Sequence, residues 1–249
     1  MKKIFVVFIM ISLVSCMSRQ NNEQPSADIN KETERIPVIF DTDANNELDD
    51  QHALAYLFSN QDVFNILAIT TNATPNGGLI AEHSTEARRV MQLYNVADEI
   101  PLYDGANGKF PELKKELEKQ EFDGDAAVNF IVKTAQNYTN HELLLLPVGK
   151  LTNIALAIEK DPSIIQNVRI VWLGSNYPEP GEYNQDADTA AMNYLLALNV
   201  PFEMVTVRYG KPTGTAAVSV TRDEVARHMP SLGPIAKQET FLSFLPLSH

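Results

Sequence analysis

From residue 36 onward, short apolar runs of strand length alternate with segments whose apolar residues recur at helical spacing. The expected strands are residues 36–40, 64–71, 100–103, 143–148, 168–174 and 202–207. The expected helices are residues 48–59, 79–95, 125–138, 151–159 and 189–198. This alternation predicts an α/β, Rossmann-like fold with a mostly parallel sheet flanked by helices. Ligands of such sheets bind beyond the carboxyl ends of the strands, so the loops after residues 40, 71, 148 and 174 are the candidate site.

The first sixteen residues have the pattern of a secretory signal. Two lysines precede an apolar run over residues 4–14, which ends in the sequence Leu-Val-Ser-Cys at Cys16. A membrane-spanning helix needs about 20 apolar residues, so this run is too short to span a bilayer. The ending resembles a bacterial lipobox, which implies cleavage before Cys16 and lipidation of its thiol.

We therefore expect three parts: a lipoprotein signal peptide over residues 1–16, a disordered tether over residues 17–35 and one domain over residues 36–249. The tether is polar and lacks aromatic residues. The lipid anchor is the expected membrane contact, and it would place the protein in the cell envelope, on the periplasmic or the outer-surface face.

The charge balance argues against nucleic acid as a partner. The chain has 20 basic and 32 acidic residues, a formal net charge of −12. Phosphate binding needs a basic patch, and none is evident in the sequence. Assembly into a homo-oligomer is left open.

The loop after the first expected strand holds five carboxylates within residues 41–50 and no basic residue. Like charges this close raise the free energy unless a positive group lies among them. Calcium and magnesium take oxygen ligands, so a hard cation is the natural partner. Capping of the next helix is the alternative for Asp49 and Asp50. It gives no reason for Asp41 and Asp43 at the end of the strand, which favours a metal site.

This loop resembles the N-terminal signature of the nucleoside hydrolases, D-x-D-P-G-x-D-D. Five residues separate Asp43 from Asp49 where the usual form has three, and Ala-Asn-Asn-Glu replaces the Pro-Gly turn. The resemblance implies that Asp43 is a Ca²⁺ ligand and the base that deprotonates water. It makes Asp50 a second ligand and Asp49 a partner of a ribose hydroxyl. Asp41 is then structural.

Two further loops are similar to the same family. Ala-Ile-Thr-Thr before Asn72 and Asn76 is similar to a segment whose asparagine contacts the ribose, and Asn76 is slightly favoured. A glycine-rich turn is the competing interpretation. The sequence Gly-Lys-Leu-Thr-Asn-Ile-Ala that follows Val148 resembles the family's G-x-L-T-N-[IL]-A stretch. The resemblance implies that the Val148 carbonyl binds calcium.

A fourth segment, Gly-Glu-Tyr-Asn with Asp188 four residues later, resembles the family's A-E-F-N-x-x-x-D. It implies that Glu182 and Asn184 hydrogen-bond the ribose hydroxyls, whereas Asp188 is interpreted mainly as a helix cap. Together the four segments span residues 36–210. They imply hydrolysis of the N-glycosidic bond of ribonucleosides to ribose and free base.

No general acid for the leaving base is assigned from the sequence. His228 and His249 lie outside matching motifs. His52, His83 and His141 are interpreted as surface or helix residues.

Two other functions stay open. The first is a non-catalytic envelope lipoprotein that binds a nucleoside or a related sugar. The second is an aspartyl phosphatase of the haloacid-dehalogenase type, with Asp41 as nucleophile and Asp43 as acid. Release of free base or ribose separates the three functions.

The resemblance also implies a late acidic calcium ligand from a C-terminal segment. No acid follows Glu239, and capping of a surface helix accounts for Asp223 and Glu224. The sequence ends in an apolar stretch over residues 241–249. We expect a C-terminally incomplete enzyme with weak calcium binding and weak hydrolysis, since calcium affinity follows ligand charge and number.

Overall fold

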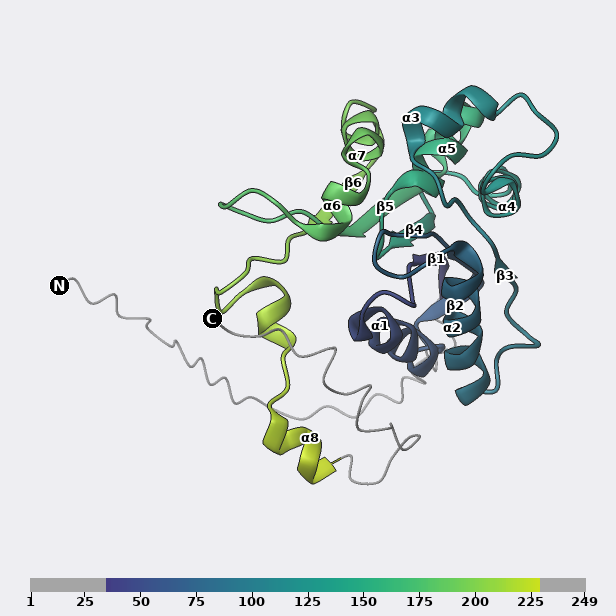
Figure 1. Cartoon of the computed structure of the whole chain (residues 1–249). Coiled ribbons are helices and arrows are strands. Elements are labelled where there is room, and N and C mark those ends of the chain that lie inside the picture. The colour runs from purple at the N-terminus through teal and green to yellow at the C-terminus, as the bar shows by residue number, and fades with distance from the viewer. Residues whose placement is uncertain (1–34, 229–249) are drawn as a thin grey trace, which may run out of the picture. The chain divides into compact units, whose positions relative to one another are not determined.

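The computed structural model describes residues 35–228, which belong to the unit Arg35–His249 (Figure 1). Its strands are β1 Ile36–Thr42, β2 Phe64–Thr71, β3 Leu102–Tyr103, β4 Leu143–Pro147, β5 Val168–Leu173 and β6 Phe202–Val205. Its α-helices are α1 Leu48–Ser59, α2 Ile80–Leu93, α3 Phe110–Leu113, α4 Asp125–Ala135, α5 Thr152–Lys160, α6 Tyr183–Ala187, α7 Thr189–Leu196 and α8 Arg222–His228. Its 3-10 helices are η1 Lys114–Glu116, η2 Pro162–Gln166 and η3 Gly214–Val218.

The six strands form one parallel sheet in the order β3-β2-β1-β4-β5-β6. The chain order reverses at β1, because β2 and β3 lie on one side of it and β4 to β6 on the other. The loops after β1 and β4 therefore leave neighbouring strands in opposite directions and open a crevice between them. In the register of the sheet, Asp41 lies opposite Thr70 of β2 and Pro147 of β4.

Side chains alternate between the two faces of the sheet and build a core on each. Val38 and Phe40 pack with α1 and α2 on one face. Ile39, Ile170 and Trp172 pack with α3, α4, α5 and α7 on the other. Figure 1 shows α1 and α2 side by side, with α5 and α7 across the sheet from them. Because helices cover both faces of the sheet, most residues of the strands are apolar, on both faces.

The predicted fold class and element order are confirmed. The helix predicted over residues 48–59 and the strand predicted over residues 64–71 coincide with α1 and β2. The other predicted elements differ at their ends by a few residues, as expected for frayed termini. Helices α3 and α6 and the 3-10 segments were not predicted, because pieces of three to five residues are too short to show a period.

Several predictions concern parts of the chain outside the described residues. These are the signal peptide, Cys16, the tether up to residue 34, and the apolar C-terminal stretch with Glu239. Within residues 35–228, no helix is long and apolar enough to cross a membrane. Helix α8 begins with a capping box, in which the Glu224 carboxylate accepts from the Thr221 backbone N–H at 2.7 Å. The Glu224 N–H donates in return to the Thr221 hydroxyl at 3.2 Å, so capping accounts for Glu224 as predicted.

Helix α2 offers a matched pair for testing the layer on the α1 and α2 face. Met91 is fully buried, whereas Leu93 on the same helix is 68% exposed. Met91→Ala should lower the free energy of unfolding by about 2–5 kcal/mol, because it leaves a cavity in the core. Leu93→Ala should change it by less than about 0.5 kcal/mol. Urea denaturation of both variants measures the difference, and equal losses would contradict this packing.

Candidate active site

The candidate site lies where β1, β2 and β4 end at the crevice. Two backbone hydrogen bonds extend the sheet there: Val148 N–H donates to Asp41 O at 2.8 Å, and Asn72 N–H donates to Thr42 O at 3.0 Å. They hold the ends of β2 and β4 against the end of β1. The segment from Asp41 to Asp43 is therefore fixed from both sides and fully buried.

Asp41 accepts hydrogen bonds from three side chains of this region. Its Oδ1 accepts from Asn72 Nδ2 at 2.7 Å, and its Oδ2 accepts from Thr70 Oγ1 at 2.6 Å and Asn153 Nδ2 at 2.7 Å. Burial raises the pKa of Asp41 to about 6, although these three hydrogen bonds lower it. Both oxygens are engaged and the residue has no exposed surface, so Asp41 is not placed to attack a phosphoryl group. This argues against the aspartyl phosphatase alternative, in which Asp41 is the nucleophile.

Asn153 links Asp41 to two more loops. Its Nδ2 also donates to Thr71 O at 2.8 Å, and its Oδ1 accepts from Ala106 N–H at 2.9 Å. Asn153 belongs to the motif Gly-Lys-Leu-Thr-Asn-Ile-Ala, from which no role for it was predicted. Its polar side chain at the start of a helix with an apolar face was the signal that it has buried partners.

Asp43 and Asp50 form a pair of buried carboxylates at the mouth of the crevice. Thr74 Oγ1 donates to Asp43 Oδ2 at 2.5 Å, and Thr42 Oγ1 donates to Asp50 Oδ1 at 2.5 Å. Burial raises the pKa of Asp43 to about 6. Burial and then the charge of Asp43 raise the pKa of Asp50 well above its ordinary value. The charge of Asp43 thus disfavours the ionised form of Asp50.

The oxygens left without partners suit a hard cation. Asp43 Oδ1, Asn46 Oδ1 and Asn72 Oδ1 are buried and accept no hydrogen bond from residues 35–228. A Cβ at Gly149 would lie 2.6 Å from Asp43 Oδ1 and 2.9 Å from Asn72 Oδ1, so both atoms converge on the Gly149 backbone. Unpaired carboxylate and amide oxygens are the donors that calcium takes. The residues present therefore fit a divalent cation.

The carbonyl of Val148, the third predicted ligand, is held by Asn184. Asn184 Nδ2 donates to Val148 O at 2.7 Å and to Leu173 O at 3.0 Å, so it joins the ends of β4 and β5. Within the described part of the chain, no three acidic, histidine or cysteine side chains converge in a way that could hold a metal ion. Asp43 and Asp50 are the two predicted acidic ligands, and both are buried.

The predicted ribose-binding residues lie around this pair. Asp49 is exposed in the first turn of α1. Asn76 is exposed, and its backbone N–H donates to the Tyr183 hydroxyl at 3.0 Å. The other candidate, Asn72, is the one that the fold buries between Asp41 and Gly149. Asn72 follows the end of β2 directly and Asn76 lies four residues later, and a loop sequence does not show which of the two faces the site.

Glu182 caps helix α6. Its carboxylate accepts from the backbone N–H groups of Ser175 at 2.7 Å, Asn184 at 3.0 Å and Gln185 at 2.9 Å. This explains why the loop after β5 turns back toward the Val148 carbonyl. A ribose hydroxyl that bound Glu182 would have to share or replace one of these donors.

Asp188 is a helix cap, as predicted. Its Oδ1 accepts from Ala191 N–H at 3.1 Å, at the start of α7. Its Oδ2 also accepts from Thr152 Oγ1 at 2.5 Å and Phe110 N–H at 2.7 Å. The cap therefore joins α7 to the starts of α5 and α3.

His83 lies on helix α2, which agrees with its interpretation as a surface or helix residue. The structure adds that it is fully buried. Its Nδ1 accepts from Asn45 N–H at 3.3 Å, which fixes the acidic loop, and burial lowers its pKa. The signal was present in the sequence, because positions 83, 87, 90 and 91 share one face of α2 and the last three are apolar.

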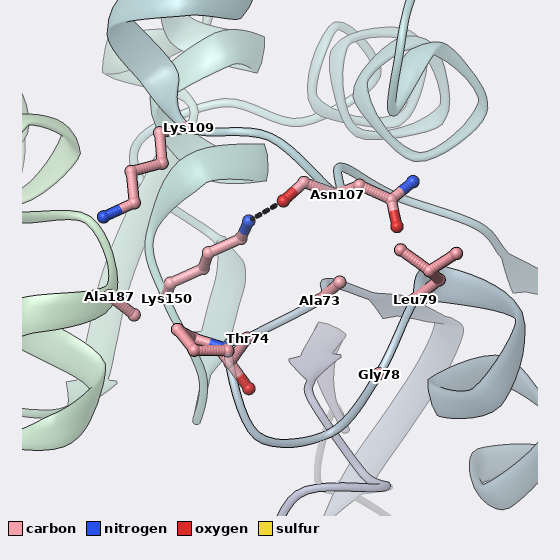
Figure 2. Close-up of a pocket in the computed structure, with 9 residues that line it drawn as sticks. Ala73, Thr74, Gly78, Leu79, Asn107, Lys109, Lys150 and Ala187 are labelled. Atoms are coloured by element: carbon pink, nitrogen blue, oxygen red, sulfur yellow. Dashed lines mark hydrogen bonds between the residues drawn. The ribbon is translucent and has the colours of Figure 1, made fainter.

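A cavity of about 380 Å³ lies beside Thr74 (Figure 2). It is lined by Ala73, Thr74, Pro75, Gly78, Leu79, Asn107, Lys109, Lys150 and Ala187. Thr74 is shared, since its hydroxyl binds Asp43. The site therefore has two parts: an acidic crevice and a mainly apolar cavity beside it, a size and lining typical of small-molecule sites.

The chain matches the family of inosine-uridine preferring nucleoside hydrolases over residues 38–245. It belongs to this family, as the resemblance of its motifs predicted.

Individual relatives are distant. An uncharacterized protein of Schizosaccharomyces pombe is 26% identical over 80% of this chain and 69% of its own length. The pyrimidine-specific ribonucleoside hydrolase RihB of Escherichia coli O1:K1 / APEC is 30% identical over 58% of this chain and 45% of the enzyme. The matched region spans about half the length of the RihB relatives. An inosine-uridine preferring nucleoside hydrolase of Bacillus anthracis superposes with a TM-score of 0.57 over 77% of this chain and 69% of its own, and at 17% identity it shows the fold alone.

The different surroundings of Asp41 and Asp43 predict that replacing each by asparagine changes the free energy of unfolding differently. Asp41→Asn should lower the free energy of unfolding by about 1–3 kcal/mol, because an amide nitrogen would face one of the buried donors. Asp43→Asn should cause no loss in metal-free protein, because it removes a buried charge with an unpaired oxygen beside Asp50. Urea denaturation in chelator, at a pH above the pKa of about 6 of both carboxyl groups, compares them. A larger loss from Asp43→Asn would contradict these roles.

Proposed function

We propose that this protein hydrolyses the N-glycosidic bond of ribonucleosides to ribose and free base, with Ca²⁺ as cofactor. The observation that supports this most is the buried pair Asp43 and Asp50, with unpaired oxygens at the carboxyl edge of the sheet, in a member of this family. A cavity large enough for a base lies beside Thr74, whose hydroxyl binds Asp43.

Asp43 is the proposed base. Its Oδ2 is held by Thr74, whereas its Oδ1 accepts no hydrogen bond from the described residues and is free to take a proton from water. Glycosidic cleavage passes through a cation-like ribosyl transition state, which the negative charges of Asp43 and Asp50 stabilise. Calcium, which Asp43, Asp50 and the Val148 carbonyl would hold, supplies a Lewis acid that lowers the pKa of water.

Ribose recognition is assigned to Asp49, Asn76, Glu182 and Asn184 by their motifs. The placement of Asn184 supports its part, because its amide already binds Val148 O beside the acids. Glu182 would act from the same loop. The exposed Asp49 and Asn76 would close on the sugar from the loops after β1 and β2.

A nucleoside-binding protein without catalysis is the second candidate. It is favoured by one observation: within residues 35–228, Asp43 and Asp50 are not joined by a third acidic, histidine or cysteine ligand. Calcium binds more weakly when fewer charged ligands are present, so we expect weak binding and slow turnover.

The test is release of ribose from inosine and uridine by the purified domain from residue 36, with calcium and with chelator. We expect slow release that depends on calcium and is lost in chelator, because both charged ligands repel each other without a cation. Reducing-sugar detection and chromatography of the base measure it.

Two variants serve as controls for this assay. Asp43→Asn should abolish release, since it removes the base and a ligand charge, whereas Asp41→Asn should retain release in the folded fraction. Release that persists in chelator would refute the metal mechanism. Nucleoside binding in calorimetry without any release would favour the non-catalytic candidate.

We also propose that the protein is anchored in the cell envelope by lipidation of Cys16. The apolar run of residues 4–14 and the Leu-Val-Ser-Cys ending support it. In a bacterial host, the full chain should sediment with membranes, and Cys16→Ser should release it, because the thiol that carries the lipid is gone. Ser15→Ala, which keeps a small residue beside the cysteine, should stay with the membranes. Membrane association of Cys16→Ser would contradict the anchor.

A further inference from the structure

Lys150 is a buried cation that the chemistry above does not use. Its residue exposure is 2%, and its chain extends from the loop after β4 along the wall of the cavity (Figure 2). Its Nζ donates to Asn107 O at 2.8 Å and to Gly108 O at 2.6 Å. It takes part in no ion pair within the part of the chain that the structure describes.

One N–H of the Lys150 ammonium group donates to no acceptor in the described residues. An ammonium group has three N–H donors, and the carbonyls of Asn107 and Gly108 take two of them. Burying a cation without a carboxylate partner costs several kcal/mol. A methionine would fill the same space without that cost, so packing alone gives no reason for the charge.

The rest of the cavity suits a flat aromatic ring. Ala73, Pro75, Leu79 and Ala187 give it apolar walls, and Thr74 connects it to Asp43. A base in this cavity would thus lie next to the acid that activates water. Its polar edge would meet the remaining donor of Lys150.

We propose that Lys150 determines which base the site accepts, by donating its third N–H to a ring carbonyl oxygen of the leaving base. This inference rests on the proposed function. An ammonium group only donates, so it pairs with the O4 carbonyl of uracil or the O6 carbonyl of hypoxanthine. Cytosine and adenine present an amino group at the corresponding position, and two donors facing each other leave both unpaired.

The charge of Lys150 also acts on the transition state. As the C1′–N bond breaks, its electron pair passes to the base, and negative charge spreads onto the ring carbonyl oxygen. The fixed ammonium stabilises this charge more than it stabilises the neutral nucleoside, so it should raise kcat as well as binding. Water adds its oxygen to C1′ and gives a proton to Asp43, and the departed base takes a proton from solvent.

The experiment compares kcat/KM for uridine and cytidine, and for inosine and adenosine, in the wild type and in Lys150→Met. We expect the wild type to prefer uridine and inosine. Lys150→Met should lose about 10- to 100-fold on these two, the value of a hydrogen bond to a charged group, with little loss on cytidine and adenosine. Unchanged ratios in Lys150→Met, with hydrolysis intact, would overturn the role of Lys150 and leave the proposed function standing.

Two other lysines control for charge. Lys133→Met removes an exposed lysine from α4 and should leave all four values unchanged. Lys109→Met removes the exposed lysine that lines the same cavity and should change the ratios less than threefold. A loss from Lys109→Met equal to that from Lys150→Met would overturn the proposal, because a diffuse positive field would then explain the preference.

Binding of the free bases tests the proposal without turnover and without relying on a variant that could unfold. Calorimetry should show tighter binding of uracil than of cytosine to the wild type. If uracil binds in this way and Lys150→Met abolishes it while no nucleoside is cleaved, the proposed function fails and the role of Lys150 holds. Equal binding of uracil and cytosine to the wild type would overturn the role of Lys150.

Discussion

The site depends on one buried carboxylate, Asp41. Its three side-chain donors come from different parts of the chain: Thr70 from β2, Asn72 from the loop after it, and Asn153 from α5. Each donor would be an unsatisfied buried polar group without Asp41, so the arrangement is mutual. The carboxylate thus sets the distance between three strand ends, and Asp43 and Gly149 take their positions from it.

The same crevice concentrates negative charge that the described residues do not neutralise. Asp43 and Asp50 are both buried, and the charge of Asp43 raises the pKa of Asp50, while Lys150 Nζ donates to the backbone carbonyls of Asn107 and Gly108. A cation and a cation-like sugar are the species that relieve such a field. Under the proposed function, the acidic half of the site would face the sugar and Lys150 would face the base. This polarity would match the direction in which electrons move when the glycosidic bond breaks.

Much of the fold was predictable because the apolar pattern is periodic over eight to fourteen residues in β2, α1 and α2. The acidic loop could also be placed at the carboxyl edge, since five carboxylates in ten residues have few structural explanations. The partners inside the site were harder to predict. Asn72 and Asn76 differ only in which side of a turn they occupy, and the role of Lys150 depends on carbonyls about forty residues away. The sequence also does not show that His83 is buried, unless its position on the apolar face of α2 is weighed above its polarity.

Asn153 lies on α5, which packs on one face of the sheet. Asp43 precedes α1 and Asp50 lies in it, and α1 packs on the other face with α2. The sheet separates these layers, and the Asp41 cluster is where they exchange side-chain hydrogen bonds. A partly unfolded state that kept one layer and lost the other would keep most of its helices, but it would break this cluster. Cation affinity should therefore report on both layers together, and a bound cation would make them unfold as one cooperative unit.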